Sequence, residues 1–235
     1  MTSSSDNYDE TVKRRYPGYR FSWEIYTDIM LENVAGKPYW LDIGAGPNIL
    51  IEEQPGFEFA VGLDIEKPDN AFVPRNSVYC LADCTLLPFK AESFDFITSR
   101  FTFEHLAAPL TALHEVARVL KPRGLFALQT TNKRNPLVVV SRVIPFALKR
   151  IIFPVLFKDN PSGTFKTRYK MNTARDIPPA IGGLKLEKLI LVEDILRHNP
   201  FLYFISSFVF RIIRLFRLDN LKGNIIAIYR KDDRI

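Results

Sequence analysis

The ten residues Tyr39–Asn48, YWLDIGAGPN, decide the fold of this chain. The first five, apolar except for one carboxylate, are typical of a short buried strand. The letters GAGP then predict a tight turn with few side chains, because glycine tolerates positive φ and leaves no Cβ in the way of a ligand. Pro47 suits the first turn of a following helix, where its missing N–H would be unpaired anyway. A strand, a glycine turn and a helix start together direct backbone N–H groups at a ligand.

The carboxylate in this stretch, Asp42, separates two interpretations of the turn. A dinucleotide-binding fingerprint has the form G-x-G-x-x-G, with an acidic residue about 20 positions later. In this chain the third glycine position is Ile49. An acid two positions before the first glycine would repel a pyrophosphate and attract a cationic amine. The residues therefore favour a ligand that brings an amine to the turn.

Further segments extend the pattern toward a parallel sheet. Phe59–Leu63 is a second short apolar strand that ends at Asp64, and an acid at this place in a doubly wound sheet can bind a pair of ribose hydroxyls. The third segment is Ser77–Leu87, which closes on Pro88-Phe89. A fourth strand is expected at Ser93–Ser99, followed by the letters FEHL at 103–106. A helix at Leu110–Leu120 and the letters KPRG at 121–124 then lead into a fifth strand at Leu125–Gln129.

In this order and spacing, the (D/E)-x-G-x-G motif at 42–46 and the later segments resemble class I S-adenosylmethionine-dependent methyltransferases, in particular the methyltransferase type 11 and quinone-methyltransferase-like group. The family often has a third glycine where this chain has Asn48. The resemblance implies an α/β fold with a Rossmann-like seven-stranded sheet, helices on both faces and an antiparallel C-terminal hairpin. Leu184–Leu191 and Gly223–Tyr229 are the segments expected to form that hairpin.

The resemblance also implies which residues bind S-adenosylmethionine. The acid of the first motif sits by the methionine ammonium, and the glycines pass beneath the nucleoside. The acid after the second strand binds the ribose, and its neighbour packs on the adenine face. The third segment supplies an acceptor for the adenine amino group and a backbone N–H for a ring nitrogen. The cofactor residues implied are Asp42, Gly44, Ala45, Gly46, Asp64, Ile65, Asp83, Cys84 and Ser99.

The candidate catalytic residue is His105, just after the fourth strand, where this class places substrate-facing residues. Histidine changes protonation near neutral pH, so it could accept the proton of a hydroxyl acceptor. The alternative is a structural role, with His105 bonded to neighbouring backbone. Glu104 and Arg100 are weaker candidates for the same pocket. No clustered His, Asp and Glu set of the kind that binds a metal is present in the sequence, so no metal is expected.

Composition gives the expected organisation and location. The 235 residues are expected to form a single domain (1–235), with insertions at 133–183 and 192–222 and disorder over 1–10. The N-terminus lacks an apolar core after a basic start, so a signal peptide is not expected. Two cysteines without further partners predict free thiols in a reducing cytosol. We therefore expect a cytoplasmic protein.

The two halves of the chain differ in charge and in the partners they predict. Residues 1–132 carry a net charge of −6 and residues 133–235 a net charge of +12, so the basic half predicts an anionic partner. Within it, 198–217 combines many aromatic residues with arginines, and its uncharged run from 198 to 210 is shorter than the ~20 residues needed to span a bilayer. This pattern favours a helix lying on the inner membrane surface, with a helix buried in the domain as the alternative.

The acceptor of the methyl group is not specified by the motifs. The basic, apolar C-terminal half favours a hydroxyl on a lipid-linked molecule, a glycan precursor or an isoprenoid. A nucleic-acid methyltransferase also suits the positive charge, but here the basic residues alternate with long aliphatic stretches. A third interpretation is a membrane-associated protein that binds the cofactor without catalysis.

Overall fold

The computed structural model describes residues 4–34, 39–47, 50–51, 57–67, 69, 71–145, 147–148, 165–197 and 199–233. The chain folds into two compact units, each assembled from separate segments. The sheet unit consists of Tyr26–Thr131, Arg168–Ile190 and Ile225–Ile235, and the helical unit of Met1–Ile25, Asn132–Thr167 and Leu191–Asn224. The helical unit takes in large parts of both segments that were expected to be insertions.

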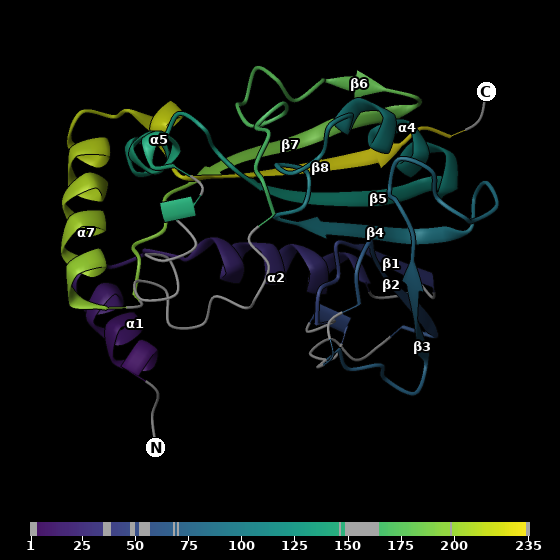
Figure 1. Cartoon of the computed structure of the whole chain (residues 1–235), viewed down its shortest axis with the longest axis horizontal. Helices are drawn as coiled ribbons and strands as arrows, with labels where there is room; N and C mark the ends of the chain where they lie inside the picture. The colour runs from purple at the N-terminus through teal and green to yellow at the C-terminus, as the bar shows by residue number, and fades with distance from the viewer. Residues whose placement is uncertain are drawn as a thin grey trace. The chain divides into compact units, whose positions relative to one another are not determined.

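The sheet unit is built on an eight-stranded sheet (Figure 1). Its strand order is β3-β2-β1-β4-β5-β8-β7-β6, and β1 pairs in parallel with β2 and β4, as do β2 with β3 and β4 with β5. Figure 1 shows β8 running opposite to its neighbours, as a C-terminal hairpin requires. The strands are β1 (Tyr39–Ile43), β2 (Phe59–Asp64), β3 (Ser77–Leu81), β4 (Phe94–Arg100), β5 (Leu120–Thr131), β6 (Ala180–Ile181), β7 (Leu184–Val192) and β8 (Asn224–Lys231).

The expected α/β class and antiparallel C-terminal strands are confirmed, whereas the expected count of seven strands is wrong. The eighth is β6, a two-residue strand that pairs antiparallel with the start of β7. Gly182 and Gly183 connect the two, with φ of +59° and +88°. A two-residue hairpin loop with positive φ at both positions is the turn that glycine pairs favour. The signal was present as the Gly-Gly pair before the expected sixth strand.

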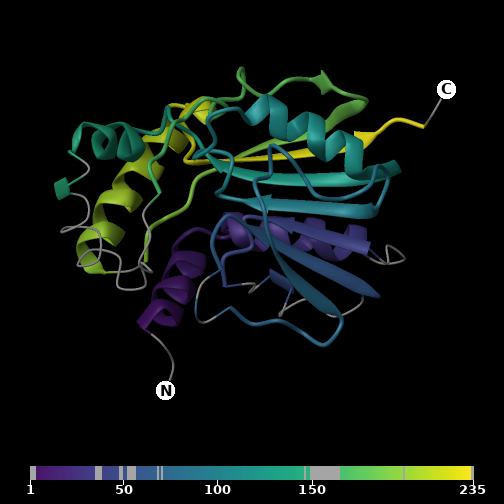
Figure 2. The ribbon, with the colours of Figure 1, turned by 45° about the vertical axis from the view of Figure 1, so that its right-hand side comes forward.

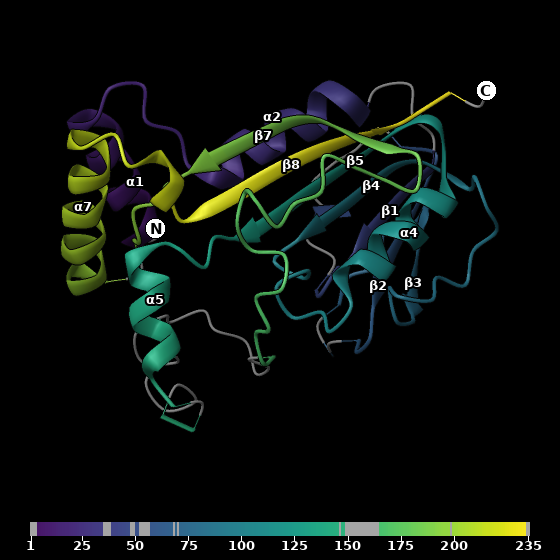
Figure 3. The same cartoon turned by 90° about the horizontal axis from the view of Figure 1, so that it is seen from above.

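Helices cover both faces of this sheet, as expected (Figures 2 and 3). The Tyr26–Val34 part of α2 lies on one face and α4 on the other. From α2, Tyr26 is fully buried and its hydroxyl donates to the Ala127 carbonyl at 2.9 Å. The helices described are α1 (Ser4–Arg15), α2 (Ser22–Val34), α4 (Pro109–Val119), α5 (Pro136–Val143), α7 (Pro200–Leu215) and the 3-10 helix η1 (Asp219–Leu221).

The N-terminal segment differs from the expected disorder over 1–10, because α1 begins at Ser4. Its composition is strongly polar, so tertiary contacts rather than its own propensity account for the helix. Val12 and Tyr16 pack in a buried cluster with Phe21 and Ile195, all within the helical unit. In the part of the chain that the structure describes, no helix is both long and apolar enough to cross a bilayer.

Candidate functional site

The glycine turn after β1 can be built only with glycine at its first position. Gly44 has φ of +75°, and a Cβ added there would lie 1.8 Å from Thr102 Oγ1. The backbone N–H groups of Gly44 and Ala45 both donate to the Leu63 carbonyl, at 2.7 and 3.0 Å. These bonds fix the turn against the end of β2. The close approach of residue 102 explains why the chain needs a glycine here.

The second glycine leaves the turn open. Gly46 also has positive φ, +51°, but a Cβ added there would meet no atom of the described residues within 4 Å. Its N–H donates to Asp64 Oδ2 at 3.0 Å, and Asp64 Oδ1 accepts from the N–H of Ile65 at 2.7 Å. Asp64 therefore holds the turn in place from the end of β2. Ile65, next to it, is 58% exposed.

Tyr79 of β3 contacts this turn, and the sequence analysis missed it. Its hydroxyl donates to the Gly46 carbonyl at 2.9 Å and lies 3.2 Å from the Glu66 carbonyl. Burial, followed by the charges of Asp64 and Asp42, raises the pKa of this phenol. The position of Tyr79 within β3 gave no local signal, because its contacts are with residues 13 and 33 positions away.

Asp42 lies deep beneath the turn. It is 2% exposed, and its Oδ1 accepts a hydrogen bond from Thr98 Oγ1 at 2.7 Å. Thr98 Oγ1 in turn accepts from Trp40 Nε1 at 2.7 Å, so the threonine is fixed as a donor to the carboxylate. Burial raises the pKa of Asp42 to about 7, while the Thr98 bond and the Arg100 charge oppose the rise. A buried carboxylate with such a pKa binds a cation more strongly than an exposed one does.

The remaining cofactor candidates lie at the same edge of the sheet and differ in their burial and hydrogen bonds. Asp83 is exposed and its Oδ1 accepts from both the N–H and the hydroxyl of Thr85, at 2.8 Å each. Cys84 is 5% exposed, and burial raises the pKa of its thiol to about 12, so this thiol is not a nucleophile at neutral pH. Ser99 is fully buried and its hydroxyl donates to the Ile43 carbonyl at 3.0 Å. Its side chain thus ties β4 to β1.

These residues gather where the strand order reverses. β1 lies between β2 and β4, and chain connections leave in opposite directions from it. In open α/β sheets, ligands bind outside the carboxyl ends of the strands at this switch point. The backbone leaves β4 through Phe101, which has φ of +51°, a conformation that non-glycine residues adopt at a cost. The structure therefore places the glycine turn and Asp64 at this switch point of the sheet.

A second cluster lies at the ends of β4 and β5. Glu104 is 7% exposed and accepts three hydrogen bonds of 3.0 Å, from the Thr130 hydroxyl and from the N–H and hydroxyl of Thr131. The Asn172 amide donates to Thr130 Oγ1 at 2.8 Å and to the Thr131 carbonyl at 2.7 Å. The carboxylate is thus held by two threonines, which the asparagine in turn fixes. Sequence reasoning treated it only as a weak candidate and missed its partners.

His105 follows this carboxylate directly. Its Nε2 lies 4.0 Å from Glu104 Oε1, and its backbone N–H donates to the Thr102 carbonyl at 2.9 Å. The imidazole is part-buried, with 27% of the side chain exposed. A structural role for His105 predicts a hydrogen bond to neighbouring backbone, and its N–H makes one to Thr102. A role as general base needs a group that orients the imidazole, and the Glu104 carboxylate is close enough to do so. The geometry is compatible with both roles.

Arg100 also lies at the end of β4. Its guanidinium is 5.6 Å from the centre of the Tyr26 ring and 5.9 Å from that of Phe101. No group of three or more His, Cys, Asp or Glu side chains suited to a metal occurs among the described residues. Cys80 and Cys84 are both free thiols.

Comparison with known proteins identifies the domain that carries the turn. Residues 41–128 match the family model described as a methyltransferase domain. This part of the chain is therefore similar to a methyltransferase domain. The matched range begins in β1 and ends in β5, so the methyltransferase domain contains the glycine turn, Asp42, Asp64 and His105.

Relatives and solved structures agree with this assignment. The chain is 30% identical over 148 residues to a demethylmenaquinone methyltransferase of Roseiflexus castenholzii, covering 59% of this chain and 61% of the relative. It is 33% identical over 111 residues to a 2-methoxy-6-polyprenyl-1,4-benzoquinol methylase of Danio rerio, covering 43% and 34%. The chain thus spans at most about three-fifths of the length of these curated relatives. The fold resembles an S-adenosylmethionine-dependent methyltransferase from Mesorhizobium loti, with a TM-score of 0.52, 16% identity and coverage of 89% and 97%.

S-adenosylmethionine is the cofactor that the sequence motif implies, and the residues present fit it. Thr98 is the one hydrogen-bond donor that the described residues supply to the Asp42 carboxylate, which leaves the acid able to accept from an ammonium. The open space over Gly46 would admit a ligand close to the backbone. Both features meet the requirements that the sequence motif predicted for a cationic amine at a glycine turn.

Proposed function

We propose that this chain is an S-adenosylmethionine-dependent methyltransferase that methylates a hydroxyl group of an isoprenoid-type small molecule. The observation that carries the proposal is the buried Asp42 carboxylate beneath an open glycine turn, at the switch point of the sheet. The names of two relatives, one acting on demethylmenaquinone and one on a polyprenyl benzoquinol, support an isoprenoid acceptor. The exposed apolar residues of the basic C-terminal half support the same class.

In this proposal, Asp42 binds the methionine ammonium and Asp64 serves two functions. Because its carboxylate already holds the N–H groups of Gly46 and Ile65, it would bind a ribose hydroxyl with its remaining lone pairs. Ile65 and Asp83, both exposed, would contact the adenine, the first by packing and the second by accepting from the amino group. The backbone N–H of Cys84 is the proposed donor to the adenine ring.

Methyl transfer to a hydroxyl requires the chain to position the two reactants and to accept one proton. S-adenosylmethionine, when bound, supplies a methyl group on a sulfonium sulfur, which keeps the bonding electron pair as the methyl leaves. His105 takes the proton of the acceptor hydroxyl as its oxygen forms the new bond to carbon, and Glu104 orients the imidazole from 4.0 Å. Placement of reactants can contribute on the order of 7–11 kcal/mol, and a general base about 10²–10⁴-fold in rate.

The test begins with binding and continues with turnover. Calorimetric titration of the purified chain with S-adenosylhomocysteine should show binding that is weakened in Asp42→Ala and retained in Asp95→Ala, which changes a carboxylate of β4 far from the turn in the sequence. Radiolabelled methyl transfer is then measured on a polyprenylated hydroquinone, on its analogue without the isoprenoid tail, and on RNA. Preference for the tailed acceptor supports the proposal. Methylation of RNA alone would refute the acceptor class, and cofactor binding without turnover on any acceptor would support a non-catalytic protein.

A further inference from the structure

The last long helix, α7, buries two serines and exposes several phenylalanines, unlike an ordinary surface helix. Ser206 and Ser207 are buried, at 0% and 7% exposure. Phe201, Phe204 and Phe208 are 62%, 72% and 59% exposed. A surface helix normally turns its apolar stripe to the core and its polar face to water. The outward face of α7 therefore needs an explanation other than core packing.

The orientation of α7 is fixed by specific contacts within the helical unit. The Asn199 side chain caps the helix by accepting from the Leu202 N–H at 2.9 Å. The Ser206 hydroxyl donates to the Leu202 carbonyl at 2.7 Å and accepts from the Leu196 N–H at 2.9 Å. Phe210, on the inner face, packs on the Tyr16 and Tyr19 rings. A rotation that buried the exposed phenylalanines would break all of these contacts.

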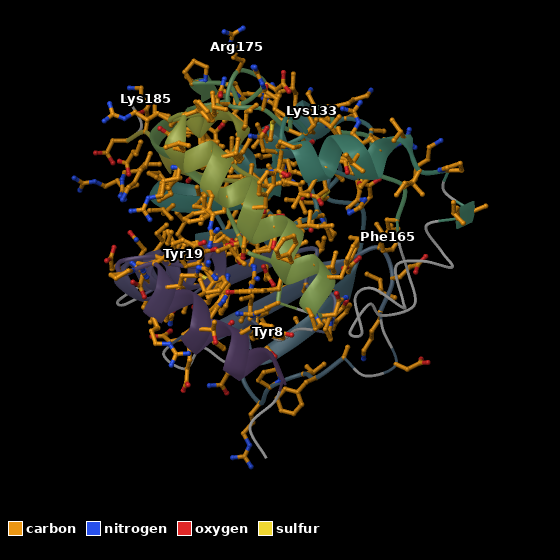
Figure 4. The ribbon with its side chains drawn as sticks, turned by 90° about the vertical axis from the view of Figure 1, so that its left-hand side faces the viewer. Tyr8, Tyr19, Lys133, Phe165, Arg175 and Lys185 are labelled. Carbon is orange, nitrogen blue, oxygen red and sulfur yellow. The ribbon has the colours of Figure 1, made fainter. Side chains whose placement is uncertain are left out.

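The exposed apolar residues form a continuous stripe along the helix. After Phe208 the stripe continues through Ile212 and Leu215, which are 36% and 73% exposed, and Phe216, 63% exposed, follows directly after the helix. Steps of three or four residues keep a stripe on one side of a helix. Figure 4 shows α7 toward the viewer, with Tyr8 beside the end at which it begins, in agreement with the ring contact of Tyr8 and Tyr203 at 5.1 Å.

A second helix of the same unit adds to this surface. α5 lies next to α7 (Figures 3 and 4) and exposes Val139, Val140 and Val143 at 46%, 61% and 78%. We call the exposed side chains of α5 and α7 the apolar ridge, comprising Val139, Val140, Val143, Phe201, Phe204, Phe208, Ile212, Leu215 and Phe216. Exposed apolar patches of this extent mark sites of protein or membrane interaction.

The two segments that carry the ridge have charges of one sign, although Asp9 of α1 and Asp219 of η1 lie next to them. No aspartate or glutamate occurs in 133–158 or in 195–218. Arg211, Arg214 and Arg217 lie toward the end of α7, all exposed, and Arg142 is exposed on α5. Lys133, labelled in Figure 4, precedes α5. An anionic partner with an apolar interior complements this surface, whereas a second copy would bring arginines against arginines.

We infer that the apolar ridge docks the protein onto an anionic phospholipid bilayer, with α7 lying in the plane of the headgroups. The phenylalanines enter the region between headgroups and acyl chains, and the arginines pair with lipid phosphates. At 16 residues α7 is too short to span the bilayer, which agrees with a helix that lies on it. This inference does not depend on methyl transfer.

The experiment is flotation of the full chain with lipid vesicles, and it needs no enzymatic readout. The wild type should float with vesicles rich in phosphatidylglycerol. Its binding should be on the order of 100-fold weaker on vesicles of phosphatidylcholine alone, because each of three arginines adds about fivefold on an anionic surface. High salt should weaken binding to the anionic vesicles.

Point variants test the ridge without removing the core contacts of α7. Phe204→Ser with Phe208→Ser should abolish flotation, and Arg214→Glu with Arg217→Glu should reduce it to the level of neutral vesicles. Leu110→Ser on α4 and Lys188→Glu on β7 are matched controls, since both residues are exposed outside the helical unit, and they should float as the wild type does. Circular dichroism and unchanged S-adenosylhomocysteine binding check that each variant is folded.

Three outcomes would overturn the inference. Wild-type flotation of the phenylalanine variant would show that the ridge is not the contact. A dimer in lipid-free solution that the phenylalanine variant disrupts, without vesicle binding by the wild type, would assign the ridge to self-association. Binding to RNA with no binding to anionic vesicles would assign the cations to nucleic acid. None of these outcomes bears on cofactor binding, so failure here leaves the proposed function to its own test.

Discussion

Replacing Asp42 by asparagine should make the free energy of unfolding less dependent on pH. In the folded protein the pKa of Asp42 rises from an ordinary 3.8 to about 7, because the carboxyl group is buried with a single donor among the described residues. A shift of this size corresponds to about 4 kcal/mol, at about 1.4 kcal/mol per unit. The folded state binds a proton more tightly than the unfolded state does. Stability is therefore lost as pH rises from about 4 to about 7, and the loss is complete above pH 7.

The amide that Asp42→Asn introduces cannot ionise but can still accept from the Thr98 hydroxyl. The difference in free energy of unfolding, variant minus wild type, should therefore grow by about 4 kcal/mol between roughly pH 4 and pH 8. A newly buried amide N–H₂ group shifts the difference at every pH by about 1–3 kcal/mol and leaves its slope unchanged. Urea unfolding followed by circular dichroism at each pH measures this difference, and all other titrating groups cancel in it. A pH-independent difference would refute the buried, proton-binding state of Asp42.

The same residue links cofactor binding to proton release. Below pH 7 the ligand-free protein carries a proton on Asp42, and an ammonium ligand that requires the carboxylate must displace it. Affinity for S-adenosylhomocysteine should rise up to about tenfold per pH unit below pH 7 and then level off. Calorimetry in buffers of different ionisation enthalpy should detect the released proton, and Asp42→Asn should release none. Asp95→Asn is the control, because this carboxylate accepts from the Tyr39 N–H and the Lys121 ammonium and has no part in the proposed cofactor site. Proton release that survives in Asp42→Asn would assign the linkage to another group.

Two further predictions follow from the geometry of the site. Gly44→Ala should unfold the turn, because its Cβ would lie 1.8 Å from Thr102 Oγ1. Gly46→Ala meets no atom of the described residues within 4 Å, so it should cost only the ~1–2 kcal/mol of a left-handed backbone while blocking the ligand. Thermal unfolding and titration of both variants check this, and equal stabilities would contradict it. His105→Gln should lower kcat by a factor of about 10²–10⁴ and leave the free energy of unfolding unchanged. Glu104→Gln should lower the free energy of unfolding by about 1.5–3 kcal/mol, because it weakens three hydrogen bonds to a buried carboxylate. An unchanged kcat in His105→Gln would leave the histidine with a structural role only.

The features that sequence predicted are those that a short segment determines by itself. The turn at Gly44 needs a conformation that few other residues adopt, and Asp42 and Asp64 follow from the ends of strands whose apolar runs are local. Even the missed strand β6 had a local signal in Gly182 and Gly183, whose paired positive φ closes a tight hairpin.

The features that sequence did not predict depend on contacts between distant segments. Glu104 finds its donors 26 and 27 positions later, and Asn172 joins the cluster from more than 40 positions away. Tyr79 reaches the glycine turn across 33 positions. Residues 1–10 were expected to be disordered, whereas α1 begins at Ser4 and is held by the packing of Val12 with residues such as Ile195. No periodicity within a segment carries this information.

The uneven charge of the chain now has a physical meaning in each unit. The cofactor is a cation at its amine and sulfur, and the carboxylates of Asp42, Asp64 and Asp83 lie at the edge of the sheet proposed to bind it. The arginines of α7 lie beside exposed phenylalanines in a stretch without any acidic residue. Buried charges are screened little by salt, whereas exposed ones lose most of their attraction beyond a Debye length of about 8 Å at physiological ionic strength. Raising the salt concentration should therefore release the protein from anionic vesicles while S-adenosylhomocysteine stays bound, because its amine is proposed to bind the buried Asp42 whereas the vesicle contact uses exposed arginines.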